Sequence, residues 1–270
     1  MHVVAVTGGK GGVGKTNIAV NLAVALSKIG RDVVLFDADL GLANVDLLMG
    51  LSVQHTLADV VSGQKKVSDI IVKDDQGVRV IPAASGITEM VNLSPEARAE
   101  IIRGLSDQLK TPDVMIVDTG AGIDETVQTF VAACQIPVLV VCDEPASLTD
   151  CYALIKVLRL SRNIKHFNIL VNQVDTQPQA RGLFDRLSAV AGKHLDVELS
   201  YLGSVPTDPY LKRAVQERRP LVAAYPRSPA ALALASCAER LVKLSTEARS
   251  PGLTFFLDKV LEGTPAASQV

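Results

Sequence analysis

A glycine-rich stretch near the start of the chain has the residue types and spacing of a phosphate-binding loop. Its eight residues, Gly9-Lys10-Gly11-Gly12-Val13-Gly14-Lys15-Thr16, fit the pattern GxxxxGK[ST] without a gap. Glycines allow backbone N–H groups to curl around a phosphate chain, and a helix beginning near Lys15 directs its positive end at the same place. The stretch predicts an ATP site in which Lys15 neutralises the outer phosphates and Thr16 binds Mg²⁺. A tight turn without a ligand would require neither side chain.

Acidic residues at two predicted strand ends complete this chemistry. Asp118 follows the apolar run 114–117, where a carboxylate can reach the metal ion of a phosphate-loop protein. Asp37 and Asp39 follow the run 32–36 and are expected at the same crevice, because parallel strands end at one edge of the sheet. We predict Mg²⁺ ligation by Thr16, Asp39 and Asp118, and orientation of the attacking water by Asp39. Asp37 can equally be a cap or turn residue.

Alternating strands and helices must position these residues. Apolar runs rich in β-branched residues predict strands over 3–6, 32–36, 78–82, 114–117, 137–142, 167–171 and 199–205. Helical patterns lie between them, over 15–29, 95–109, 124–133, 147–160, 179–191, 209–217 and 229–244. The alternation predicts an α/β fold with a doubly wound, mostly parallel sheet and helices on both faces.

The chain is expected to divide into one ATPase domain, residues 1–245, and an appendage, residues 246–270, made of a linker, an amphipathic helix and a flexible tail. The helix has an apolar stripe formed by Leu253, Phe256, Leu257, Val260 and Leu261. Its polar face is slightly acidic, whereas helices that bind membrane surfaces usually carry Lys and Arg there. Docking on the protein and binding to a membrane both stay open.

Composition limits the function classes. The net charge of −2 does not favour a nucleic-acid binder, which usually has a clearly basic domain. No apolar run is long enough to cross a bilayer and no signal peptide is recognised, so a cytoplasmic protein is expected. The four cysteines form no CxxC pair, which favours buried free thiols over a metal or cluster site.

The second lysine of the loop carries a family resemblance. The segment KGGVGKT at 10–16 resembles the deviant phosphate loop of the MinD/ParA ATPases. The resemblance implies an ATP-dependent homodimer in which Lys10 reaches the partner's phosphates and shares catalysis with Lys15 and Asp39. It also identifies 37–51 as switch I and 118–122 as switch II, and matches Asp150 to a residue that holds the lysine in the monomer. Its nucleotide-binding set includes Asn17 after the loop, with Asn172, Pro206 and Asp208 near adenine.

Several longer segments resemble the FlhG/FleN branch of flagellar-number regulators. They are TGGKGGVGKTN at 7–17, DADLGLANVD at 37–46, IPAASG at 81–86 and LVVCDEPASLTDCYALIK at 139–156, together with the ending around PGLTFFLDKVL. The resemblance implies binding and restraint of the flagellar master activator, a FleQ-like AAA+ transcription factor. With the first strand starting at Met1, we expect no N-terminal extension of the kind that stimulates FlhF. A spatial-positioning ATPase acting on membrane or DNA is the alternative.

Other classes are weighed against specific residues. Asn172 and Asp175 have the NxxD spacing of a guanine site, but Gln173 stands where Lys is usual. DNA partition would need a basic surface, for which Lys212, Arg213, Arg218 and Arg219 are the notable cluster. The scattered cysteines disfavour an iron–sulfur carrier, and the intact Lys15, Thr16, Asp39 and Asp118 disfavour a non-catalytic module.

Overall fold

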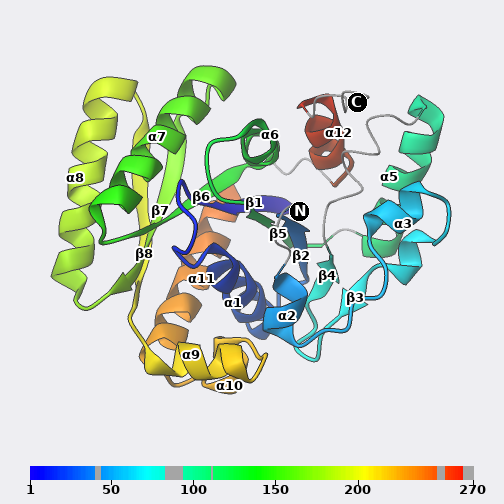
Figure 1. Cartoon of the computed structure of the whole chain (residues 1–270), viewed down its shortest axis with the longest axis horizontal. Coiled ribbons are helices and arrows are strands. Elements are labelled where there is room, and N and C mark those ends of the chain that lie inside the picture. The colour runs from blue at the N-terminus through cyan, green and yellow to red at the C-terminus, as the bar shows by residue number, and fades with distance from the viewer. Residues whose placement is uncertain (40–43, 83–93, 111, 248–252, 264–270) are drawn as a thin grey trace.

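The fold is built on one sheet of eight strands in the order β3-β4-β2-β5-β1-β6-β7-β8 (Figure 1). The computed structural model describes residues 1–39, 44–82, 94–110, 112–247 and 253–263. β3 runs antiparallel to β4, and the other neighbouring pairs are parallel. The strands are β1 His2–Thr7, β2 Val33–Ala38, β3 Val72–Lys73, β4 Arg79–Ile81, β5 Val114–Thr119, β6 Ile136–Cys142, β7 His166–Val174 and β8 Glu198–Pro206.

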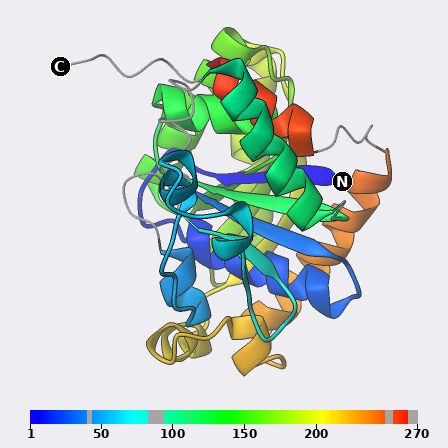
Figure 2. The same cartoon turned by 90° about the vertical axis from the view of Figure 1, so that its right-hand side faces the viewer.

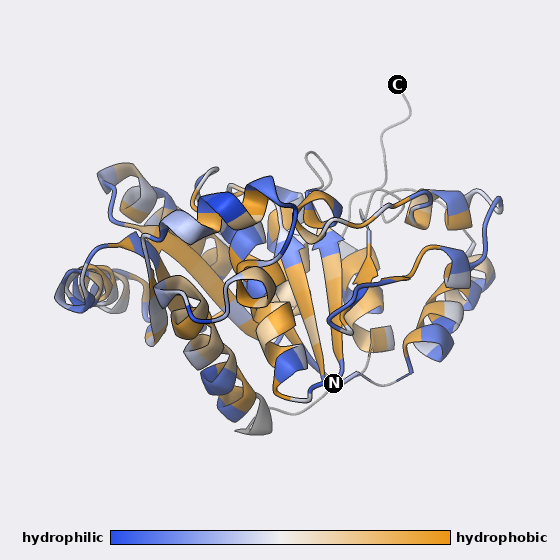
Figure 3. Ribbon diagram, turned by 90° about the horizontal axis from the view of Figure 1, so that it is seen from below, coloured by the Kyte–Doolittle hydropathy of each residue, from blue (hydrophilic) through white to orange (hydrophobic). Residues whose placement is uncertain are grey.

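The central strands are covered on both faces, which explains their continuous apolar runs. Every residue of β2, β5 and β6 is buried. A parallel sheet between two helical layers requires this, because both faces of each strand contact apolar side chains. The central strands are accordingly hydrophobic along most of their length in Figure 3.

Two layers of helices enclose the sheet. The helices of one layer share a single core cluster. They are α1 Lys15–Lys28, α2 Val45–Met49, α9 Pro209–Gln216, α10 Leu221–Ala224 and α11 Pro229–Glu247. The opposite layer contains α3 Leu57–Val61, the 3-10 turn η1 Val67–Asp69, α5 Pro95–Leu109, α6 Glu125–Ala133, α7 Pro145–Arg162, α8 Gln177–Leu195 and α12 Leu253–Gly263. The prediction of a doubly wound, mostly parallel α/β fold is confirmed.

Helix α12, for which the sequence left docking on the protein and binding to a membrane open, packs on the rest of the fold in this structure. All five residues of its apolar stripe are buried, and Phe256 contacts Phe36 of β2 with ring centroids 6.0 Å apart. The Thr129 hydroxyl of α6 donates a hydrogen bond to the Gly263 carbonyl at 2.9 Å. Figure 2 shows α12, in red, beside α5 and above the sheet. The helix therefore shares the core that covers β2.

Short elements were missed by the sequence patterns. The expected strands and helices are present with ends shifted by up to four residues, whereas α2, α3, η1, β3 and α10 were not anticipated. Each has five residues or fewer, too few to establish a helical or alternating period. Parts of several predicted segments lie outside the described residues: 40–43 of switch I, 83–86 of the IPAASG segment, 248–252 of the linker and 264–270 of the tail.

Candidate nucleotide site

The glycine-rich loop connects the carboxyl end of β1 to the first turn of α1. Gly14 is the N-cap residue of α1, with φ of 91°, and no side chain caps this helix end. The first turn also has no acidic residue. Backbone N–H groups at an uncapped helix start bind anions well, because they have no acceptor within the helix and lie at the positive end of its dipole.

Close packing and open space alternate along the loop. A Cβ added to Gly9 would lie 2.1 Å from the Asp150 carbonyl oxygen, and one added to Gly14 would lie 2.5 Å from the Asn172 amide nitrogen. Gly11 and Gly12, in contrast, have no atom of a described residue within 4 Å of an added Cβ. The loop is thus held against β7 and α7 at its ends and is open in the middle, which is a suitable shape for a phosphate chain.

Asn172 supports the loop directly. Its side-chain amide donates a hydrogen bond of 2.8 Å to the Val13 carbonyl, and the residue is buried. The family resemblance assigned Asn172 to adenine, and nothing in the structure tests that assignment. The bond to the loop was not anticipated, since a contact between residues 159 apart leaves no local pattern in the sequence.

Two carboxylates lie side by side below the loop. Parallel pairing of β2 with β5 makes Asp37 and Asp118 direct neighbours, and both are buried. Burial raises the pKa of Asp118 to about 8, although a hydrogen bond with the Thr16 hydroxyl opposes the shift. Burial likewise raises the pKa of Asp37 to about 6, against hydrogen bonds from the backbone of Asp39 and Val45. Such a pair favours a nearby cation.

The described residues meet the requirements of a magnesium ion. Within the described ranges, Oδ1 of Asp118 is buried without a hydrogen-bond partner. The Thr16 hydroxyl bonds the same carboxyl group, so two oxygen donors converge at the helix start. Oxygen donors are the ligands that Mg²⁺ prefers, and it usually takes only one or two from the protein and the rest from phosphates and water. The predicted ligands Thr16 and Asp118 therefore fit the ion.

Lys15 lies close enough to Asp118 and Asp39 to interact with their charges. Its side chain is 8% exposed, and burial lowers its pKa, while Asp118 and Asp39 act in the opposite direction. Asp39 follows β2 and lies next to Gly120. A Cβ added to Gly120 would be 3.6 Å from the Asp39 Oδ1. The structure thus brings the two predicted switch segments together beside the loop lysine.

Lys10 is held within its own chain by a residue that the sequence did not indicate. Its ammonium group lies 2.6 Å from the Glu144 carboxylate, and this bond raises the Lys10 pKa. Asp150, the residue expected from the resemblance, adds only a weaker charge effect. Glu144 is the N-cap residue of α7, two residues after β6 ends, so the expectation for Asp150 is corrected to Glu144. The backbone of Asp150 instead packs against Gly9.

The other predicted nucleotide contacts have structural partners. Asp208 is buried, and its two carboxylate oxygens accept hydrogen bonds from the Tyr210 and Ala230 backbone N–H groups. It therefore links the start of α9 to α11. Pro206 ends β8, and the Asn17 carbonyl in α1 accepts a bond from Asn21. A role of these residues in base or ribose binding stays a prediction.

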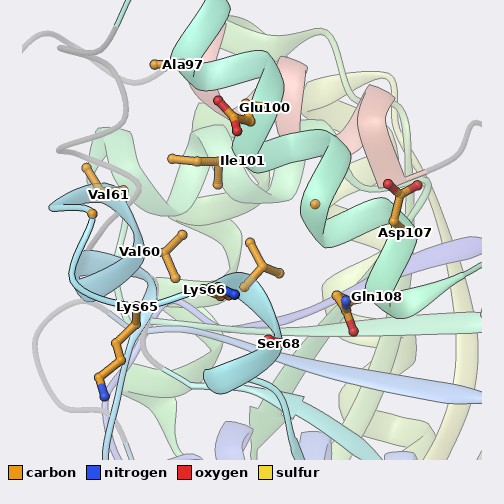
Figure 4. A pocket seen from close by; sticks show the side chains of 13 residues that line it. Val60, Val61, Lys65, Lys66, Ser68, Ala97, Glu100, Ile101, Asp107 and Gln108 are labelled. Carbon is orange, nitrogen blue, oxygen red and sulfur yellow. The ribbon is translucent and has the colours of Figure 1, made fainter.

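A cavity of about 540 Å³ lies elsewhere, between the α3–η1 segment and α5 (Figure 4). Val60, Val61 and Ile101 form apolar parts of its wall, and Lys65 and Glu100 are among its charged residues. None of its lining residues belongs to the nucleotide site predicted from the sequence.

Comparison with known proteins agrees with this geometry. Residues 1–242 match the ParA family described as "NUBPL iron-transfer P-loop NTPase". The chain is 46% identical to the antiactivator FleN of Pseudomonas aeruginosa, covering 100% of this chain and 97% of that protein. It is 35% identical to the flagellum site-determining protein YlxH of Helicobacter pylori, covering 96% and 89%.

Solved structures give the same result. One chain of the MinC:MinD cell division protein complex of Aquifex aeolicus superimposes with a TM-score of 0.71 at 29% identity, covering 93% of this chain and 98% of that one. MinD of Pyrococcus horikoshii complexed with Mg-ADP gives 0.69 at 28% identity, covering 92% and 99%. The chain belongs to the ParA family of P-loop NTPases, and it is a nucleotide-binding ATPase of the MinD/ParA class.

The four cysteines of the chain all lie within the described residues. All four are free thiols, and burial raises the pKa of Cys142 and of Cys237 to about 11. Across the described ranges, no group of three or more His, Cys, Asp or Glu side chains could hold a metal ion. No helix in the part of the chain with described coordinates is long and apolar enough to span a membrane.

Proposed function

We propose that this protein is an ATP-dependent dimerising switch that controls flagellar number by binding and restraining a flagellar AAA+ transcription activator. The observation that carries this proposal is the 46% identity to the antiactivator FleN over the whole chain. The similarity to YlxH, named as flagellum site-determining, supports the flagellar process.

The switch is proposed from the chemistry of the loop. Two subunits face each other across two ATP molecules, and Lys10 of each leaves Glu144 to contact the other's phosphates. ATP then binds the dimer better than the monomer and shifts the equilibrium toward the dimer. Lys15 and Lys10 stabilise the charge of the phosphoryl group, and Asp39 orients the water. Mg²⁺, held by Thr16 and Asp118 and in the proposed set also by Asp39, would supply further neutralisation when bound.

The molar mass in solution tests the switch. With Mg-ATP we expect a dimer, and with Mg-ADP a monomer. Lys10→Ala is expected to lose the dimer and the turnover while retaining monomeric ATP binding. Asp39→Ala is expected to retain the ATP dimer because hydrolysis is blocked. A mass that does not depend on nucleotide would sink the proposed switch.

Binding of the activator is tested separately. A pull-down of the host's flagellar AAA+ activator is expected to succeed with Asp39→Ala in ATP and to fail with Lys10→Ala. Deletion of the gene should raise the number of flagella per cell. An unchanged number would remove the flagellar role and leave the ATPase assignment standing.

A second function is a positioning ATPase at a membrane, favoured by the similarity to MinD. Helix α12 would have to leave the core to expose its apolar stripe to lipid. Co-sedimentation with anionic vesicles in ATP, absent for a chain ending at residue 247, would support this function.

A further inference from the structure

A small cavity lies along the outer edge of β8, between α8 and α11. Its volume is about 190 Å³, and its wall includes Arg181 of α8, Tyr201 and Ser204 of β8, and Ser236 and Arg240 of α11. β8 is the last strand of the sheet, so one of its edges has no neighbouring strand in the described fold. The nucleotide site, at the carboxyl ends of β1, β2 and β5, shares none of these side chains.

The Tyr201 ring is fixed, but its hydroxyl group is unpaired. The Arg181 guanidinium lies over the ring at 3.8 Å from the centroid, and the Phe184 ring packs edge-on with centroids 5.3 Å apart. The hydroxyl oxygen is buried without a hydrogen-bond partner among residues 1–39, 44–82, 94–110, 112–247 and 253–263. Because buried polar groups are nearly always hydrogen-bonded to protein or to ordered water, this hydroxyl is available to a ligand or a water at the cavity wall.

Arg240 is held across the strand edge. Its Nη1 donates a 2.7 Å hydrogen bond to the Leu202 carbonyl. Gly203 permits this approach, since an added Cβ would be 3.3 Å from Nη1 and 2.5 Å from the Cys237 Sγ. A guanidinium has five N–H donors, so one bond to the strand orients the group and leaves further donors for a ligand.

The charge of the cavity is positive. No acidic side chain lines it, and neither Arg181 nor Arg240 makes a salt bridge with a described residue. Two guanidinium groups and an unpaired hydroxyl in the wall of one cavity are donors suited to a phosphate or carboxylate group. The volume lies below the usual range for drug-sized ligands, which limits the occupant to a small group.

We propose that the cavity at the β8 edge is a second ligand site, which binds a small oxyanion through Arg181, Arg240 and the Tyr201 hydroxyl. The shared chemistry is that of inorganic phosphate and of a short carboxylate. The site is separate from the phosphate loop, and its assignment does not rest on the proposed flagellar function.

Calorimetric titration of the full chain tests the site. The phosphate loop is first saturated with a non-hydrolysable Mg-ATP analogue, which also fills the γ-phosphate position so that added anions do not bind there, and ionic strength is kept constant with NaCl. Sodium phosphate and sodium acetate are then titrated separately, and the tighter binder identifies the oxyanion class. We expect saturable binding that Tyr201→Phe and Arg181→Gln each weaken by about tenfold or more. Arg103→Gln, an exposed arginine on α5, is the matched control and should change nothing.

Tyr201→Phe keeps the ring contacts, so a change in folding does not obscure the result. Without added anion, its melting temperature should equal or exceed that of the wild type, because an unpaired buried hydroxyl is removed. Absence of saturable binding by either anion would overturn the proposal. Anion affinities of Tyr201→Phe and Arg181→Gln equal to that of the wild type would also overturn it. So would a melting temperature of Tyr201→Phe below that of the wild type in anion-free buffer.

Discussion

At the residue scale, the nucleotide site depends on side chains that meet from distant parts of the chain. Lys15 and Thr16 begin α1, Asp118 is the last residue but one of β5, and Asn172 lies in the buried stretch of β7. The loop motif identified the first two, and strand ends indicated Asp118. The hydrogen bond from Asn172 to Val13 and the ion pair of Lys10 with Glu144 had no sequence signal, because each joins residues more than 130 positions apart.

Replacement of Asn172 by Ala should loosen the phosphate loop. The buried Val13 carbonyl would keep only the weaker Cys142 thiol donor at 3.6 Å, which should lower the free energy of unfolding by about 1–2 kcal/mol and weaken ATP binding. Asn168→Ala is a matched control on the same strand, since the Asn168 amide bonds the Pro137 carbonyl at 3.3 Å, away from the loop. Chemical denaturation and ATP titration check both variants. Equal loss of ATP affinity in the two would contradict the role of Asn172.

Replacement of Glu144 by Gln should promote the ATP dimer. The substitution removes the ion pair between Lys10 and Glu144. A larger fraction of the Lys10 side chains is then available to contact the second subunit. Both side chains are substantially exposed, at 38% and 57%, so the effect on the dimer dissociation constant should be modest. Asp143→Asn, the neighbouring acid, is the control. Mass photometry across protein concentrations measures the constant, and a weaker dimer in Glu144→Gln would refute the competition.

At the element scale, the sequence predicted the apolar stripe of α12 but not the surface that the stripe covers. The stripe of Leu253, Phe256, Leu257, Val260 and Leu261 was visible in the sequence and is buried as a unit. The spacing of these residues does not predict which surface the helix covers. That surface is formed by side chains of β2, α5 and α6, which come together only when the sheet is complete.

Two neighbouring phenylalanines of α12 separate core packing from surface effects. Phe256 is fully buried against Phe36, whereas Phe255 is 46% exposed. Phe256→Ala should lower the free energy of unfolding by about 3–4 kcal/mol, because it leaves a cavity in the core. Phe255→Ala should cost far less. Urea denaturation measures both, and similar midpoints would show that α12 does not belong to the cooperative core.

At the scale of the whole molecule, ligand binding and stability are linked through the buried charges of the site. Lys15, Asp37 and Asp118 are buried beneath the loop, and burial disfavours the charged form of each. ATP with Mg²⁺ binds the folded state and should therefore raise the melting temperature.

Removal of the metal tests that linkage. Addition of EDTA to the ATP complex should lower the melting temperature toward the nucleotide-free value, because the triphosphate and the buried carboxylates then repel each other. Thr16→Ala should show a smaller difference between the two conditions, since a ligand of the ion is missing. Differential scanning calorimetry measures the shift. An EDTA effect of equal size in Thr16→Ala would contradict the assignment of Thr16.

The sequence by itself determined the phosphate loop, the alternation of strands and helices, and the family resemblance, because each is a local pattern of residue types and spacing. Tertiary structure alone decided the partner of Lys10, the support of the loop by Asn172, the surface covered by α12 and the cavity that Tyr201 lines together with two arginines. These features arise from the pairing and packing of strands and helices that lie far apart in the chain. Such pairing brings side chains together without leaving a periodic signal at either position.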